Sequence, residues 1–566
     1  MALKDSSMTR LRWPRRRFLA ATLLAPLASA CSGRRGGARR DPGGVLTVST
    51  EQQASWVRNF NPLLAPGNIR WPTRAGIYEP LFIYDTMGGK VVPWLSSGFT
   101  WGPDKRTLHC TLRPGVTWSD GQPFTADDVV FTFEILQRHK ALDLFGVWSF
   151  LDDVRATAPD TVVFSLNKQY VPGLVYLGHQ PIVPRHVWRD VPDPVTFTNE
   201  RPVATGPFTE ITVFQNQVYE LGRNPRYWQP GKPALRGLRF PAYPGNDQAT
   251  LALLHGEVDW AGNFVPDVER IFVARDPAHH HYWFPLVGGT VMLYPNAARA
   301  PLSDERVRKA ISMSIDRALL VKVAMYGYTR AADATGLHDG YARFRSPEAA
   351  AAGDWISHDM DRAGRLLDEA GYPRRADGLR ASADGAPLTL DVHVVTGWSD
   401  WIRAAQIIAQ GLRSLGITSA ARAYDFSAFF EKLQKGAFDL SLGWSSDEPT
   451  PYHFYRDLMG TATLRPLGEP AARNWHRFGS EEADALLAAF EGAADEREEM
   501  RLSHALERLF ATRAPVIPLF PNPSWAAFNT RHFEGFPSVQ DPYAKPSPYS
   551  APECLLVLTR VTPRGA

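Results

Sequence analysis

The segment 112–133, LRPGVTWSDGQPFTADDVVFTF, constrains the fold more than any other part of the chain. Its pattern predicts a strand, a tight turn, a short clamped loop and the start of a helix. Asp120-Gly121 is a turn dipeptide, because glycine adopts positive φ without steric cost. Thr125 and Asp128 have the spacing of a capping box ahead of apolar residues at helical spacing. We therefore expect a helix that begins after Thr125.

The chain has 566 residues, which is more than one hydrophobic core supports, so we expect about two to four domains. Glycine and proline are spread evenly along the chain, which indicates discontinuous domains rather than domains separated by long linkers. Strand-like runs at 44–50 and 388–395 alternate with helical patterns at 303–319, capped by Ser303, and at 400–416. This mixture predicts an α/β fold.

Short strings along most of the chain resemble the family 5 extracytoplasmic solute-binding proteins, the peptide, nickel and oligosaccharide receptors of ABC importers. The segment 112–133 is closely similar to the most recognisable stretch of that family. Other strings follow the family's order and spacing: YEPLFIYD at 78–85, ATGPF at 204–208, RNPRYW at 223–228, LLHGEVDW at 253–260, PLSDERVRKAISMSIDR at 301–317, FDLSLGW at 438–444 and APVIPLF at 514–520.

The resemblance implies a two-lobed, periplasmic-binding-protein-like fold (type II, cluster C) with an additional domain and a hinged cleft between the lobes. The domains that it implies are discontinuous: domain I at 45–78, 207–289 and 516–566, domain II at 79–206, and domain III, the ligand-closing lobe, at 290–515. It also implies a monomer that closes on a small-molecule ligand and delivers it to ABC permease subunits in the inner membrane. No cofactor is implied.

The first residues have the features of an export signal. Arg15 and Arg16 match the twin-arginine pattern, and the apolar run at 18–30 is shorter than the roughly 20 residues that span a bilayer. We therefore expect residues 1–30 to be a cleaved signal peptide. Cys31 follows directly, as in bacterial lipoproteins, so we expect a periplasmic or cell-surface protein that is lipid-anchored at Cys31. The alternative is a disordered basic leader on a cytoplasmic protein.

After Cys31, residues 32–44 contain no apolar side chain larger than alanine apart from Pro42, which predicts that 31–44 is a flexible tether. Residues 1–30 carry six basic residues and one acidic residue, so their removal changes the net charge from +3 to −2. A weakly acidic mature chain has no electrostatic signature of nucleic-acid binding. Cys110 and Cys554 then remain in an oxidising compartment, where they form either a disulfide or two buried thiols.

The segment 443–455, GWSSDEPTPYHFY, contains the main candidate for ligand contact. By resemblance, Asp447 stands where peptide-binding members place the aspartate that pairs with the ligand's α-ammonium, after a tryptophan that is Trp444 here. Such a charge-assisted hydrogen bond is worth roughly 1.5–3 kcal/mol. The alternative is that Asp447 caps a turn at Glu448-Pro449. The resemblance thus favours an oligopeptide or dipeptide ligand.

A second set of residues favours an oligosaccharide. Trp398 and Trp401, with Tyr452 further on, lie in segments that resemble the branch of the family that binds β-linked oligosaccharides. Tryptophan rings pack on the apolar faces of sugars, while polar side chains bind the hydroxyls. A core position is the alternative for Trp398, because most tryptophans are core residues. Glu51 and Trp56 are further candidates, since the family builds part of the cleft wall after its first strand.

An enzyme is the hypothesis from another class. The sequence contains no GxSxG elbow, HExxH motif, phosphate-binding loop or GxGxxG fingerprint. A glycosidase needs only two carboxylates at a suitable separation, so a secreted hydrolase is the remote alternative. The consecutive histidines at 279–281 cannot all face one ion, which argues against a metal site. We therefore expect a binding protein without catalytic residues, cofactor or metal.

Overall fold

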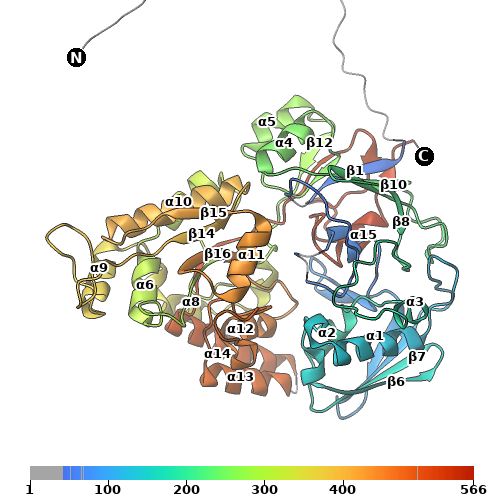
Figure 1. Ribbon diagram of the computed structural model, residues 1–566, viewed down its shortest axis with the longest axis horizontal. Coiled ribbons are helices and arrows are strands. Elements are labelled where there is room, and N and C mark those ends of the chain that lie inside the picture. The colour runs from blue at the N-terminus through green and yellow to red at the C-terminus, as the bar shows by residue number, and fades with distance from the viewer. Residues whose placement is uncertain (1–42, 51, 66, 68, 494, 566) are drawn as a thin grey trace, which may run out of the picture. The chain divides into compact units, whose positions relative to one another are not determined.

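The computed structural model describes residues 43–50, 52–65, 67, 69–493 and 495–565 (Figure 1). The expected signal peptide, Cys31 and most of the expected tether lie outside the described residues, and so does Glu51. The chain from residue 43 onward belongs to one compact unit.

The predicted strand, turn and capped helix are present. Strand β5 (Thr107–Leu112) leads to a turn at Gly121, whose φ of +94° is accessible to glycine. Helix α1 (Ala126–Arg138) follows, and the Thr125 amide donates a hydrogen bond of 2.9 Å to the Asp128 carboxylate. The other Asp128 oxygen accepts a hydrogen bond from the Arg185 amide at 2.9 Å. The capping box is therefore confirmed. Its Asp128 also holds the segment that begins at Arg185.

Three larger sheets organise the described residues (Figure 1). The four-stranded antiparallel sheet has the order β4-β5-β7-β6, with β4 at Ser96–Trp101, β7 at Thr161–Leu166 and β6 at Leu151–Ala158. The seven-stranded sheet has the order β12-β18-β11-β1-β10-β9-β8, with strands at His280–Tyr282, Ala527–Asn529, Trp260–Ala261, Val45–Ser49, Gly237–Pro241, Val218–Gly222 and Glu210–Gln215. The five-stranded sheet has the order β15-β14-β16-β13-β17, with strands at Ala421–Tyr424, Val392–Val395, Leu440–Trp444, Thr290–Pro295 and Ile517–Pro521.

Two small strand pairs and a set of helices complete the fold. The pairs are β2 (Phe82–Asp85) with β3 (Lys90–Pro93) and β19 (Phe533–Glu534) with β20 (Thr562–Pro563). The helices are α2 (Gly173–Gly178), α3 (Arg185–Trp188), α4 (Asn246–Leu254), α5 (Val268–Ile271), α6 (Glu305–Met313), α7 (Arg317–Leu319), α8 (Pro347–Ala352), α9 (Met360–Glu369), α10 (Ser399–Ser414), α11 (Phe426–Lys435), α12 (Pro451–Met459), α13 (Glu481–Glu491), α14 (Glu496–Arg513) and α15 (Cys554–Leu558).

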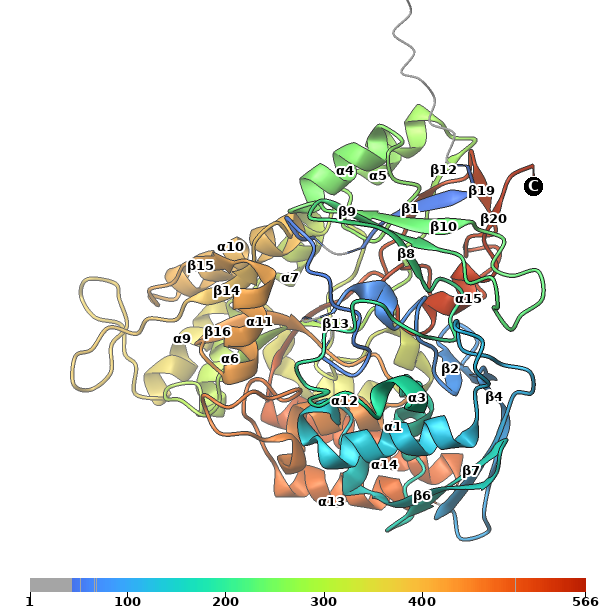
Figure 2. The ribbon, with the colours of Figure 1, turned by 45° about the vertical axis from the view of Figure 1, so that its right-hand side comes forward.

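Within this unit the elements form two groups, which we call lobes (Figures 1 and 2). The first lobe contains the seven-stranded and four-stranded sheets, from residues 43–289 and 522–565. The second lobe contains the five-stranded sheet and helices α6 to α14, from residues 290–521, and its helices α10 and α11 pack against β14 and β15. The predicted α/β class therefore holds for both lobes.

Two expectations differ from the structure in detail. The helix expected at 303–319 is capped by Asp304, whose side chain accepts a hydrogen bond from the Arg306 amide, and it already ends at Met313. The expected start of the last domain I segment at 516 precedes β17, but β17 pairs with β13 in the second lobe. The chain returns to the first lobe only after β17, so that boundary is too early. The other domain boundaries stay predictions.

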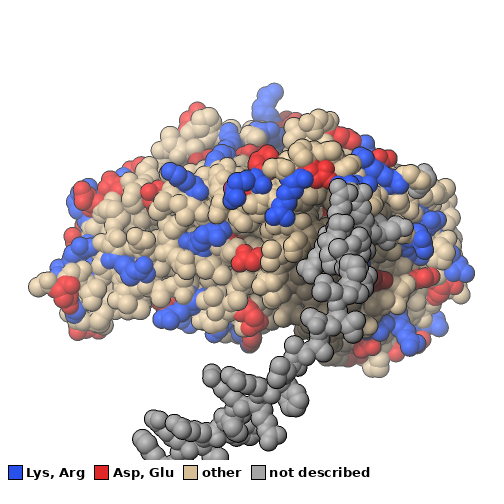
Figure 3. All heavy atoms as spheres, turned by 90° about the horizontal axis from the view of Figure 1, so that it is seen from above, with Lys and Arg blue, Asp and Glu red and all other residues tan. Residues whose placement is uncertain are grey.

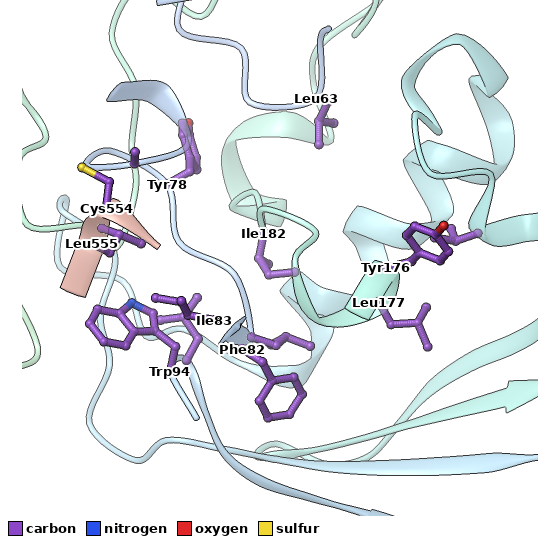
Figure 4. Packing of buried hydrophobic residues seen from close by; sticks show 14 of the residues in the cluster. Leu63, Tyr78, Phe82, Ile83, Trp94, Tyr176, Leu177, Ile182, Cys554 and Leu555 are labelled. Carbon is purple, nitrogen blue, oxygen red and sulfur yellow. The ribbon is translucent and has the colours of Figure 1, made fainter. Parts of the chain in front are cut away.

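Cys110 and Cys554 are two free, buried thiols. Cys110 lies in β5 of the four-stranded sheet, whereas Cys554 begins α15 and packs beside Tyr78 and Leu555 in the core of the first lobe (Figure 4). Burial raises the pKa of both thiols, that of Cys110 to about 12. Of the two possibilities that the sequence left open, buried thiols are the one observed.

Basic and acidic side chains are interspersed on the face seen from above, so neither sign of charge dominates it (Figure 3). Among the described residues, no helix is both long and apolar enough to cross a bilayer.

Candidate functional site

The loop between β16 and α12 carries the predicted ligand-binding aspartate to the contact between the lobes. Trp444 is the last residue of β16, and Pro451 is the first residue of α12. The Ser445 side chain fixes the start of the loop, because its Oγ accepts a hydrogen bond of 2.8 Å from the Thr290 amide in β13. Asp447 and Glu448 therefore project from a loop that is held at both ends by regular structure.

Asp447 pairs with a lysine of the other lobe. Lys545 Nζ donates a hydrogen bond of 2.6 Å to Asp447 Oδ2, and its side chain is only 8% exposed, whereas that of Asp447 is 45% exposed. Burial opposes ionisation of Asp447, but the charge and the hydrogen bond of Lys545, together with His338, outweigh it, so the pKa of Asp447 lies below its ordinary value. Burial opposes the charge on Lys545 too, but Asp447 and Glu553 raise the pKa of this ammonium.

Glu448 has a different environment from its neighbour. Its carboxylate Oε2 lies 3.7 Å from His179 Nδ1 in the first lobe, and its backbone carbonyl accepts a hydrogen bond of 2.6 Å from the Tyr341 hydroxyl. Burial, and then the Asp447 carboxylate, raise the pKa of Glu448 to about 7. Burial lowers the pKa of His179 to about 4, so this imidazole is neutral at physiological pH.

A guanidinium completes the polar part of the site. Arg473 Nε lies 2.9 Å from Asp457 Oδ2, and the Arg473 side chain is 42% exposed. A cavity of about 80 Å³ joins these groups, and it is lined by Tyr294, Trp444, Ser445, Ser446, Asp447, Glu448, Asp457, Leu458, Arg473, Asn474 and Trp475. Pockets that hold drug-sized ligands measure roughly 300–1,000 Å³. All of these lining residues belong to the second lobe, and in this conformation the cavity is too small for a solute of more than a few atoms.

An aromatic wall continues from this cavity along the second lobe. We give this name to Trp398, Trp401, Phe426, Phe430, Trp444 and Trp475. The Phe430 and Trp444 rings are stacked with centroids 6.0 Å apart, and Trp475 meets Trp444 edge-on at 5.3 Å. Trp398, Phe426, Phe430 and Trp444 are half-buried, so they present ring surface, whereas Trp401 and Trp475 are buried behind them. Such a surface can bind sugar rings or apolar side chains.

The structure brings some of the predicted residues together and separates others. Asp447, Trp444 and Trp398 lie at the cavity or on the aromatic wall. Trp401 is 4% exposed and meets the Trp398 ring edge-on at 4.9 Å, so it supports the wall from behind. As ligand-binding residues all four stay predictions.

Tyr452 and Trp56 are buried in this conformation. The Tyr452 hydroxyl donates to Glu491 at 2.8 Å and lies 3.1 Å from the Tyr170 hydroxyl of the other lobe. The Trp56 indole donates to the Phe240 carbonyl at 2.9 Å within the first lobe. Contact of Tyr452 with a ligand would require the lobes to separate, and both assignments stay predictions.

Sequence reasoning missed Lys545, Glu448 and Arg473 as members of the site. Glu448 directly follows Asp447, and this adjacency is the sequence feature that could have pointed to it. Lys545 and Arg473 are distant in sequence from Asp447, and no local pattern marks them.

A second and larger cavity, of about 490 Å³, lies elsewhere. It lies beside β12 and β18, is lined by first-lobe residues that include His281, Phe536 and Arg564, and contains none of the predicted site residues. Movement of the lobes would not close it. Among the described residues, no group of three or more histidine, cysteine or carboxylate side chains is arranged to hold a metal ion.

Comparison with known proteins identifies the family. A model of the bacterial extracellular solute-binding proteins, family 5 Middle, matches residues 90–463. The nickel-binding periplasmic protein of Escherichia coli (strain K12) is 27% identical over 427 residues, which cover 72% of this chain and 78% of that protein. A putative ABC transporter peptide-binding protein of Brucella ovis is 28% identical over 325 residues, or 56% of this chain and 58% of that protein.

A solved structure shares the whole architecture. The periplasmic oligopeptide-binding protein of an oligopeptide ABC transporter from Thermotoga maritima, crystallised with mannohexaose, superposes with a TM-score of 0.84 at 25% identity and covers 92% of this chain and 99% of its own. The predicted two-lobed fold is confirmed by this similarity. Since the family model matches more than half of its residues, the chain belongs to the bacterial extracellular solute-binding proteins of family 5, the solute-capturing components of ABC importers.

Proposed function

We propose that this protein captures oligopeptides or dipeptides between its lobes and delivers them to the permease of an ABC importer. The main support for this proposal is the composition of the cavity beside the lobe contact. It is lined by two carboxylates, Asp447 and Glu448, and by the partly exposed guanidinium of Arg473, and it adjoins the aromatic wall. A peptide has an ammonium, a carboxylate and apolar side chains, so each ligand group has a complementary surface here. The peptide-related names of the relatives in Brucella ovis and Thermotoga maritima support this proposal.

Binding and release without catalysis accounts for these features. A ligand that contacts both lobes binds the closed state better than the open state, and this difference in affinity shifts the population towards closure. The closed protein then docks on the permease as a monomer, and no cofactor takes part.

An oligosaccharide is the second candidate ligand, and the aromatic wall is the observation that favours it. Trp398, Trp444, Phe426 and Phe430 present ring surface next to the cavity, and stacking on such rings is how proteins bind pyranose faces. The Thermotoga maritima structure contains mannohexaose, which supports this alternative.

A thermal-shift comparison tests the two candidates. A ligand that binds only the native state stabilises it by about 2.7 kcal/mol at a hundredfold excess over Kd. We expect a synthetic tetrapeptide pool to raise the melting temperature, and cello-oligosaccharides and manno-oligosaccharides to leave it unchanged. A rise with the oligosaccharides alone would reject the peptide proposal and leave the second candidate.

Replacement of Trp398 is expected to separate the ligand classes further. In a peptide receptor, Trp398→Ala should change tetrapeptide affinity by less than about threefold, because charged groups contribute most of the directional binding. In an oligosaccharide receptor it should lower affinity by roughly tenfold or more, because a stacking surface is lost. Calorimetry on this variant and on Trp101→Ala, a half-buried tryptophan of β4 outside the site, makes the comparison.

Export and anchoring belong to the same proposal. The twin-arginine pattern at Arg15 and Arg16 and the small residues before Cys31 support cleavage after residue 30 and lipidation of Cys31. Mass spectrometry of the protein from its native membrane should find an N-terminal, diacylated or triacylated Cys31. An unmodified Cys31 in membrane fractions would contradict the anchor but not the export. Replacement of both Arg15 and Arg16 by lysine should block export if the twin-arginine route is used.

A further inference from the structure

Lys545 is a fixed part of the first lobe. Its backbone amide donates a hydrogen bond of 2.8 Å to Glu553 Oε1, and Glu553 also accepts hydrogen bonds from the amide and the hydroxyl of Thr86, at 3.1 and 2.7 Å. The Lys545 side chain is 8% exposed and extends to Asp447 of the second lobe, with its Nζ 3.9 Å from Glu553 Oε2. The protein thus supplies its own buried ammonium to the Asp447 carboxylate.

This ion pair changes what Asp447 can offer a ligand. A ligand ammonium would meet a carboxylate that is already neutralised by a cation 2.6 Å away, so it would add a second positive charge beside Lys545. Glu448 lines the same cavity, and no lysine or arginine of the described residues forms an ion pair with it within 4 Å. Among the described residues, its carboxylate has one basic side chain within 4 Å, the imidazole of His179 at 3.7 Å.

We propose that Lys545 acts as a built-in counter-cation for Asp447, and that Glu448 is the carboxylate that receives the α-ammonium of the ligand. This assignment rests on the proposed peptide function and divides the two neighbouring carboxylates into separate roles. Lys545 is then a positioning residue that acts through Asp447 when the lobes meet, and Glu448 is the residue that selects ligands with a free amino terminus.

The charges around Glu448 predict proton movement on binding. Asp447 and Asp457 disfavour its ionised form, while Arg473 and Lys545 favour it, and the facing imidazole of His179 is neutral. Burial and Asp447 raise the pKa of Glu448 to about 7, so near neutral pH part of the population holds a proton on Glu448. An arriving ammonium stabilises the carboxylate and expels that proton. A ligand without an ammonium expels none.

The experiment measures binding of a synthetic tetrapeptide pool and of the same pool after N-acetylation, by calorimetry at pH 6.5 in two buffers of different ionisation enthalpy. The wild-type protein should bind the free-amine pool at least tenfold more tightly and release protons on binding. Glu448→Gln should abolish both the preference and the proton release. Glu220→Gln, a matched change in β9 of the first lobe away from the cavity, should keep both.

Two further variants isolate the role of Lys545. Asp447→Asn should keep the preference for free amines, because Glu448 remains. Lys545→Met should widen that preference, because it removes the competing ammonium and leaves two carboxylates for the ligand. Thermal melts of each variant confirm that the protein is folded at the temperature of the titration.

The outcomes separate this assignment from the proposed function. Loss of the preference in Asp447→Asn together with its retention in Glu448→Gln would overturn the assignment while peptide binding stands. Equal binding of the free-amine and N-acetylated pools by the wild-type protein would also overturn the assignment of Glu448 and leave peptide binding intact. Binding of neither pool would reject the peptide function itself, and the assignment with it.

Discussion

Replacing Gly245 with alanine is expected to weaken ligand binding by roughly 10- to 100-fold, or about 1.4–2.7 kcal/mol. Gly245 precedes α4 in the first lobe and has a φ of −171°, an extended conformation that alanine adopts without strain. A Cβ atom at this position would lie 2.9 Å from the Cα atom and 3.0 Å from the carbonyl oxygen of Gly397, which precedes α10 in the second lobe. Both neighbours are backbone atoms, so the new methyl group can be accommodated only if the segments separate.

The contact at Gly245 lies at a point where the lobes are directly hydrogen-bonded. The Asn246 amide donates to the Gly397 carbonyl at 2.9 Å, and the Asn246 side chain donates to Asp400 Oδ1 at 3.0 Å. A methyl group at Gly245 therefore weakens this direct contact between the lobes. The closed state should therefore lose free energy relative to the open state, and ligand affinity falls with the closed population.

Calorimetry with the best ligand and small-angle scattering with and without it measure this effect. The wild-type radius of gyration should fall on ligand binding, and the Gly245→Ala radius should fall less at saturation. Gly98→Ala is the matched control, since Gly98 lies in β4 and a methyl group added there would have no atom within 4 Å. Unchanged affinity in Gly245→Ala would mean that closure does not depend on this contact.

Gly397→Ala should have a larger effect than Gly245→Ala. Gly397 has a φ of +88°, and a Cβ atom would lie 2.4 Å from the Pro244 carbonyl oxygen. Backbone strain therefore adds to the steric wedge. Gly371→Ala separates the two causes, because Gly371 has a φ of +89° and open space around it.

Local patterns in the sequence were sufficient for the elements that form by local rules. The α1 cap depends on residues three apart, and the strand expected at 388–395 contains β14 because its alternating apolar residues fit one buried face. The cap of α6 was misassigned by one residue, since Ser303 and Asp304 are both good caps and only the path of the chain selects between them.

The candidate site required information that no local pattern holds. Trp398 and Trp401 look equivalent in sequence, but Trp401 lies on the buried face of α10 while Trp398 precedes the helix and stays half-buried. Asp447 was predicted as a ligand contact through a family resemblance, and this assignment stays a prediction. Its partner Lys545 lies in another lobe, and the pairing follows from the way in which the C-terminal segment returns to the lobe contact.

Glu507→Gln is expected to stabilise the protein at alkaline pH by about 2–3 kcal/mol. Glu507 lies on α14 with a fully buried side chain. Its Oε2 accepts a hydrogen bond of 2.8 Å from the Ser346 amide, while its Oε1 has no hydrogen-bond partner among the described residues. Burial raises the pKa of this carboxyl from 4.5 to about 7, with Asp333 contributing in the same direction. Ionisation therefore places a charge with one unsatisfied oxygen in the core.

The sign of the pH dependence follows from the raised pKa. Between pH 4.5 and about 7 the unfolded chain has lost the Glu507 proton while the folded protein still holds it, so the wild-type stability falls as pH rises through this window. Above pH 7 both states are ionised and the penalty is constant. A shift of this size corresponds to about 3 kcal/mol, which is an upper value for the gain in Glu507→Gln.

Urea denaturation at pH 5.0 and pH 8.5, followed by tryptophan fluorescence, tests this expectation. Glu507→Gln should match the wild-type protein within about 1 kcal/mol at pH 5.0, where the buried carboxyl is neutral, and exceed it at pH 8.5. Glu482→Gln, at an exposed position of α13, should show no such pH-dependent difference. A difference between Glu507→Gln and wild type that is the same at both pH values would show that Glu507 is ionised throughout, and that its buried charge is compensated by its surroundings.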